Sequence, residues 1–114
     1  MIIEKRTAPM FDQKNFNKYG IFIVLSYKGK LIILPGTKND LHVGLFIDFM
    51  FDRGIAEEDL KCLGGGNLEI NPTMKNFSVW GESSFYGGEP ERKSTIEYIG
   101  RQLPGFSFKA KDDL

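Results

Sequence analysis

KNDLHVGLFIDFMFDRG, residues 38–54, is the stretch around which we expect the fold to form. Apolar residues recur at helical spacing from Leu45 to Met50, and Gly54 is a natural stop, so the pattern predicts a helix over residues 41–53. Asp40 is the expected N-cap, because its carboxylate can accept from open backbone N–H groups one turn into the helix.

The only histidine of the chain, His42, falls in the first turn of this predicted helix. There it lies among unpaired N–H groups at the positive end of the helix dipole, a setting that attracts anions such as phosphate. The same setting disfavours the imidazolium, so the ring is expected to be neutral and able to act as base or nucleophile. The alternative is that His42 is an ordinary first-turn residue with no chemistry.

The composition is that of one globular domain. The chain has 114 residues, of which 41% are hydrophobic and 26% are charged, which is enough for a single core. Its 15 basic and 15 acidic side chains cancel, so net charge gives no support for a nucleic-acid or membrane partner. The single cysteine, Cys62, fits a reducing compartment, and one cysteine with one histidine argues against a structural zinc site.

Targeting signals are not evident in the sequence. The first ten residues carry charges where a signal peptide needs an apolar core, and no apolar run is long enough to cross a membrane. We therefore expect a cytoplasmic protein.

Strands are predicted on both sides of the first helix. Residues 20–27, nearly all apolar, predict a buried strand, and residues 31–34 predict its returning partner after a turn at Lys28 and Gly29. Residues 67–70 and 76–83 predict two more strands, and residues 106–110 alternate as a half-buried final strand. Residues 1–17 show no sustained period, and a short leading strand or a loose arm is expected there.

A second helix is predicted near the C-terminus, where Ile96, Ile99 and Leu103 form an apolar stripe. Its start is either Pro90 as a first-turn residue or Ser94 in a capping box. The order of strands, helix, strands, helix and strand predicts an α/β (α+β) fold. We expect a mixed β-sheet flanked by two α-helices, in a single domain that spans residues 1–114.

Three consecutive glycines at residues 64–66 invite comparison with a phosphate-binding loop, since glycine lets backbone N–H groups approach an anion closely. No Gly-Lys-Ser/Thr follows them, and no G-x-G-x-x-G motif opens a helix. We therefore expect a bulge or turn that enters a sheet. Cys62, just before them, is expected to be a buried small hydrophobe rather than a nucleophile, because no second histidine is available to activate it.

Short motifs in a fixed order carry a more specific signal. They are G-I-F at residues 20–22, D-L-H at 40–42, C-L-G-G-G at 62–66, V-W-G-E-S-S-F-Y-G at 79–87, and the segment from S-T at 94–95 to Pro104. In this order they resemble the Janus/Ocnus family, which includes phosphohistidine phosphatases. The resemblance extends from about residue 18 to about residue 110.

The resemblance implies a metal-independent protein phosphohistidine phosphatase, a phosphoamidase that needs no cofactor and no metal. It makes His42 the catalytic residue, attacking phosphorus or activating the attacking water. Substrate binding would fall to the backbone N–H groups of Val43, Ser83 and Phe85, and to Asn67 in the place of a family arginine. The implied partner is a phosphohistidine-containing protein or a small phosphorylated substrate, with no nucleic acid and no membrane, and the protein is expected to be a monomer.

The chain departs from the family at two charged positions. The family has a phosphate-binding lysine on the first strand, where this chain has Ile23, or Phe22 if the alignment slips by one. It also has an arginine directly after the glycines, where Asn67 can donate only a neutral hydrogen bond. Lys18, Lys38 or another lysine could compensate.

A second function from a different class therefore stays open. It is a catalytically weak Janus-like regulatory protein that binds phosphorylated or acidic partners. Leu41 stands where the family has a tyrosine. This difference would change a contact with the substrate but not the catalytic role of His42.

Overall fold

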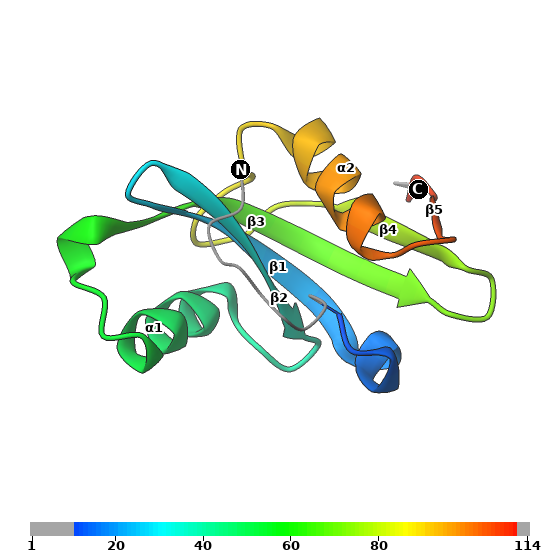
Figure 1. Ribbon diagram of the computed structural model, residues 1–114, viewed down its shortest axis with the longest axis horizontal. Coiled ribbons are helices and arrows are strands. Elements are labelled where there is room, and N and C mark those ends of the chain that lie inside the picture. The colour runs from blue at the N-terminus through cyan, green and yellow to red at the C-terminus, as the bar shows by residue number, and fades with distance from the viewer. Residues whose placement is uncertain (1–10, 112–114) are drawn as a thin grey trace.

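A five-stranded sheet with a helix on each face organises the computed structural model, which describes residues 11–111 (Figure 1). The strands are β1 (Tyr19–Tyr27), β2 (Lys30–Thr37), β3 (Leu60–Asn71), β4 (Asn76–Trp80) and β5 (Ser107–Phe108). The α-helices are α1 (His42–Asp52) and α2 (Arg92–Gln102), and short 3₁₀ helices occupy Gln13–Lys18 and Glu57–Asp59. The strand order is β2-β1-β3-β4-β5, and only the β4–β5 pair is parallel, so the sheet is mixed as predicted.

Two cores lie on opposite faces of the sheet because successive side chains of β1 point to opposite faces. Phe22 packs in the core that Ile99 of α2 closes, whereas the next residue, Ile23, packs in the core that Phe49 of α1 closes. Burial on both faces explains why the sequence of β1 is almost wholly apolar. The predicted fold, a mixed sheet flanked by two helices in one compact domain, is confirmed.

The hairpin between β1 and β2 turns at Lys28 and Gly29, as predicted, and both residues have positive φ, 50° and 78°. β2 continues past the predicted end at residue 34 and reaches Thr37. It includes Pro35, which lacks a backbone N–H but is tolerated because β2 is an edge strand of the sheet.

The glycine triplet lies inside β3, and the prediction that a strand begins only at Asn67 is wrong. Val24 of β1 pairs with Gly64, whereas Leu25 pairs with Cys62, so Leu63 is the extra residue of a β-bulge. The predicted bulge is therefore present, but it interrupts a strand that has already begun. Pairing with β1 and β4 on either side outweighs the weak strand propensity of glycine.

The C-terminal half contains three further corrections. β4 ends at Trp80, and not at residue 83, because Gly81 adopts φ 70° and turns the chain away from the sheet. α2 begins at Arg92 with Glu91 as its N-cap, so neither predicted start is correct and Ser94 lies within the helix. The final strand covers only Ser107–Phe108.

For the leading segment, residues 1–17, the sequence predicts a strand or a loose arm. Residues 1–10 lie outside the described part of the chain. Asp12 caps the 3₁₀ helix Gln13–Lys18, so the described part of this segment holds no strand. Within residues 11–111, no helix has both the length and the apolar character that a membrane crossing requires.

Candidate functional site

The first turn of α1 lacks a side-chain cap. Leu41 is the N-cap residue, and its apolar side chain makes no capping bond. The prediction that Asp40 caps α1 is wrong, because its carboxylate accepts instead from the backbone N–H of Thr37 at 2.7 Å. Asp40 thus stabilises the turn that leaves β2 rather than the helix.

Open N–H groups result from this arrangement. The first bond of the helix runs from the Leu45 N–H to the Leu41 carbonyl at 3.0 Å. The N–H groups of His42, Val43 and Gly44 consequently have no partner within the helix. Together with the helix dipole they form a region of positive potential that favours a bound anion.

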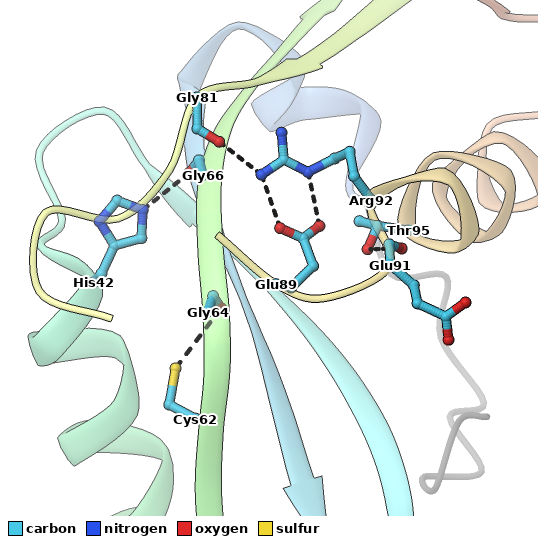
Figure 2. A network of polar contacts seen from close by, with 9 residues as sticks. All are labelled: His42, Cys62, Gly64, Gly66, Gly81, Glu89, Glu91, Arg92 and Thr95. Carbon is cyan, nitrogen blue, oxygen red and sulfur yellow. Dashed lines mark hydrogen bonds and ion pairs between the residues drawn. The ribbon is translucent and has the colours of Figure 1, made fainter. Parts of the chain in front are cut away.

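The imidazole of His42 lies between α1 and β3 (Figure 2). Its Nε2 atom is 2.9 Å from the carbonyl oxygen of Gly66. Because a carbonyl can only accept, Nε2 must carry the proton, and Nδ1 of the neutral ring keeps its lone pair. β3 thus fixes the tautomer and leaves Nδ1 as the basic atom.

The loop after β4, residues 81–89, packs against the glycines of β3. The Ser83 N–H donates to the carbonyls of Gly65 at 3.0 Å and Gly87 at 3.2 Å, and the Gly65 N–H donates to Gly87 at 2.9 Å. A Cβ added to Gly65 would lie 3.2 Å from Cδ2 of His42. His42 and the loop therefore contact the same short piece of β3.

The three predicted phosphate-binding N–H groups differ in their availability. Val43 has an open N–H in the first turn of α1. The Ser83 N–H is engaged by the Gly65 and Gly87 carbonyls, and the Phe85 N–H donates to the Ser83 hydroxyl at 3.2 Å, as does the Tyr86 N–H at 3.0 Å. Ser83 is buried, and its hydrogen bonds hold the shape of the loop. A phosphate bound at this loop would replace the Ser83 hydroxyl as the acceptor of the Phe85 N–H.

Aromatic contacts join this loop to α1. The ring of Phe85 is 70% exposed and packs edge-on against Tyr86, with 4.8 Å between the ring centroids. Tyr86 in turn lies 5.7 Å from the ring of Phe46 in α1. The loop is therefore fixed both to β3 and to the helix that carries His42.

The positions where the resemblance leads us to expect cations are residue 23, or residue 22 in the shifted alignment, and residue 67, and all of them hold uncharged side chains. Ile23 is fully buried in the core on the α1 side and pairs with Gly65, so an apolar side chain stands beside His42. Asn67 is partly buried, and its Nδ2 lies 2.5 Å from where a Cβ on Gly81 would be. Its amide therefore packs under the start of the 81–89 loop.

Of the two lysines named as substitutes, Lys18 lies just before β1 and Lys38 just after β2. The backbone N–H of Lys38 donates to the carbonyl of Lys18 at 2.9 Å, and the stem of Lys38 lies against Gly20. Lys38 also lines a hollow with Glu69 and Asn71, at the C-terminal end of β3. Neither contact places an ammonium group at His42.

Cys62 is partly buried beside the core on the α1 side, and its thiol contacts the Gly64 carbonyl at 3.7 Å. Burial raises the pKa of the Cys62 thiol, so the thiolate is disfavoured and the residue behaves as the predicted small hydrophobe. In the described part of the chain, no three His, Cys, Asp or Glu side chains lie together as a group that could hold a metal ion.

Glu89 and Arg92 are near this site and were missed by the sequence analysis. Arg92 donates from Nε to Glu89 at 2.8 Å, and from Nη2 to Glu89 at 2.7 Å and to the Gly81 carbonyl at 2.6 Å (Figure 2). Burial alone would raise the pKa of Glu89, but hydrogen bonds from Arg92 and Thr95 outweigh it and hold the pKa below its ordinary value. The signal available in the sequence was the spacing of opposite charges in E-P-E-R, which does not reveal that the pair is buried.

Comparison with known protein families gives a match over most of the chain. The Janus/Ocnus family model matches residues 11–107, which include α1, the glycines of β3 and the 81–89 loop. No curated protein matches the chain at a significant level.

Proposed function

Because the chain belongs to the Janus/Ocnus family, we propose that it is a metal-independent protein phosphohistidine phosphatase with His42 as its base or nucleophile. The single observation that carries the proposal is the 2.9 Å contact between His42 Nε2 and the Gly66 carbonyl. In the neutral ring, this contact places the free lone pair on Nδ1, at the uncapped start of a helix where a phosphoryl group would be attracted. The substrate is a phosphohistidine-containing protein or a small phosphorylated molecule, and the protein acts as a cytoplasmic monomer.

The reaction transfers a phosphoryl group from an imidazole nitrogen to water. In one route, Nδ1 of His42 takes a proton from water as the water oxygen attacks phosphorus. The P–N bond then breaks, and the leaving imidazole takes up a proton. In the other route, Nδ1 attacks phosphorus directly, the P–N bond of the substrate breaks, and its leaving imidazole takes up a proton. Water then attacks the phosphorylated His42, which releases inorganic phosphate and restores the imidazole.

Charge stabilisation in either route falls to backbone N–H groups. Phosphoryl transfer spreads negative charge over the equatorial oxygens and depends mainly on positioning and on fixed donors. The open N–H groups at the start of α1, Val43 among them, are such donors. The loop that Ser83 holds against Gly65 supplies a rigid opposite wall, with the Phe85 N–H within it.

The test is release of inorganic phosphate from a phosphohistidine peptide by the wild-type protein and by His42→Ala. A positioned base contributes roughly 10²- to 10⁴-fold, so we expect His42→Ala to lose at least about 100-fold in kcat. Asn39→Ala changes an exposed residue in the same connection and serves as the matched control, with activity close to wild type. Full activity of a folded His42→Ala protein would overturn the proposal.

A trapping experiment separates the two routes, because His42 is the only histidine of the chain. Direct attack leaves acid-labile, base-stable label on the protein after rapid quenching with base, whereas water activation leaves none. Label that persists in His42→Ala would contradict direct attack by this residue.

The second candidate function is the regulatory one, in which the protein binds phosphorylated or acidic partners with little turnover. The observation that favours it is the fully buried, apolar Ile23 together with the uncharged Asn67, which leaves both family cation positions neutral. On this hypothesis, the wild-type protein binds inorganic phosphate or a phosphopeptide but releases no phosphate from phosphohistidine in the same assay.

A further inference from the structure

One guanidinium group joins the two ends of the 81–89 loop. Arg92, the first residue of α2, donates to the Gly81 carbonyl at the start of the loop. The same side chain donates twice to the Glu89 carboxylate at the end of the loop. The loop is therefore closed by a single side chain from outside it.

The carboxylate of this pair is shielded from water. The side chain of Glu89 is only 2% exposed and that of Arg92 is 28% exposed. A bidentate arginine–carboxylate pair has a fixed planar geometry, and its hydrogen bonds are stronger where water is excluded. The Glu89–Arg92 pair thus holds Gly81 in one position rather than in a range of positions.

The pair and His42 lie on opposite sides of the same strand (Figure 2). A Cβ added to Gly66 would lie 2.9 Å from Nη2 of Arg92 and 2.8 Å from the Gly81 carbonyl. The carbonyl of that same Gly66 accepts from His42 on the other side. Arg92 therefore lies on the opposite face of β3 from His42, and it contacts the start of the 81–89 loop.

From these contacts we infer that Arg92, together with Glu89, is the positioning residue that sets the 81–89 loop against His42. The inference rests on the proposed function for its catalytic consequence. Arg92 touches no phosphate and acts through Gly81 and the backbone of the loop. Misplacement of a reacting group by about 1 Å can cost roughly 100-fold in rate, so loss of this anchor should be visible in turnover and in anion binding.

The test compares Arg92→Gln and Arg92→Lys with Arg101→Gln. Arg101 lies on the same helix and contacts the ring of Tyr98, 5.8 Å away, so it serves as the matched control. We expect Arg92→Gln to weaken inorganic phosphate binding about tenfold or more and to lower kcat by a similar factor. Arg92→Lys keeps the charge but cannot reproduce the planar fork, and it should be intermediate. Arg101→Gln should match the wild type.

Two readouts separate positioning from a purely structural role. A structural role would lower the folded fraction and with it the apparent kcat, but KM and the phosphate Kd of the folded molecules would be unchanged. Amide hydrogen exchange of Ser83 and Gly87, measured without ligand, should accelerate about tenfold or more in Arg92→Gln if the anchor is lost. If Arg92→Gln does not fold, Arg92→Lys gives the same readouts.

Each outcome decides one proposal. Unchanged exchange at Ser83 and Gly87, or an unchanged phosphate Kd in folded Arg92 variants, would overturn the positioning role. A wild-type protein that binds no inorganic phosphate would overturn it as well. A wild-type protein that binds phosphate and shows these Arg92 effects, but does not hydrolyse phosphohistidine, would reject the phosphatase and leave the positioning role intact.

Discussion

Restoring an arginine at residue 67 should strengthen phosphate binding at His42. Side chains alternate along β3, and Gly65 faces His42 while Gly66 faces Arg92, so residue 67 returns to the His42 side of the sheet. Asn67 contributes at most a neutral hydrogen bond there, whereas an arginine in its place would present a charged, planar fork to two phosphate oxygens.

The expected magnitude depends on the contact that Asn67→Arg would add. A hydrogen bond to a charged group contributes about 1.5–3 kcal/mol, which corresponds to roughly 10- to 150-fold in affinity. Residue 67 is only partly buried, and solvent screens such a contact, so the lower end of about tenfold is expected. On the phosphatase hypothesis, turnover of phosphohistidine should rise by about tenfold or more as well.

The assay is a phosphate titration monitored by amide chemical shifts, with turnover of a phosphohistidine peptide measured on the same samples. Shifts should centre on Val43 and Phe85, and Asn76→Arg, on the far end of β4, serves as the control for added charge. A folded Asn67→Arg protein with the same phosphate Kd as the wild type would refute the placement of the anion between α1 and the 81–89 loop. Rescue of binding without any turnover would favour the regulatory function.

Two further predictions concern stability. In Gly64→Ala, the free energy of unfolding measured in urea should fall by roughly 3 kcal/mol, because φ is 141° and the new Cβ would collide with the backbone of Gly88 and Glu89. Gly44→Ala is the control: the space around Gly44 is open, so its free energy of unfolding should not change. The second prediction concerns pH: the folded pKa of Glu89 lies below its ordinary value of 4.5, so its contribution is present above that value and is lost as pH falls through the folded pKa. The free energy of unfolding should therefore decline more steeply below about pH 4.5 in the wild type than in Glu89→Gln, and equal slopes would contradict the role of the ion pair.

The placement of His42 could be predicted because it depends on local sequence. The apolar periodicity of residues 45–50 and the stop at Gly54 put the start of α1 within one residue of its observed position. The cap could not be predicted in the same way. Asp40 had two sets of N–H groups within reach, and the end of β2 at Thr37 decided between them.

The glycines and the buried ion pair show where local reasoning fails. Strand propensity alone excludes the three glycines from the predicted strand. In the structure, β3 pairs with β1 on one side and β4 on the other, and the pairing with β1 joins segments that are far apart in the sequence. In the sequence, Glu89 and Arg92 are two opposite charges three residues apart, and nothing there shows that the carboxylate is buried. Only the fold brings the Gly81 carbonyl to them and covers the carboxylate.

Residues 64–66 have no side chains, so at these positions β3 is only as thick as its backbone. Elsewhere, two layers of packed side chains separate what happens on one face from what happens on the other. At Gly66, the guanidinium on one face and the imidazole on the other lie close to the same residue. A substitution of Arg92 on the α2 side is therefore separated from His42 only by the backbone of Gly66. The two faces of this small domain should be probed together when its variants are interpreted.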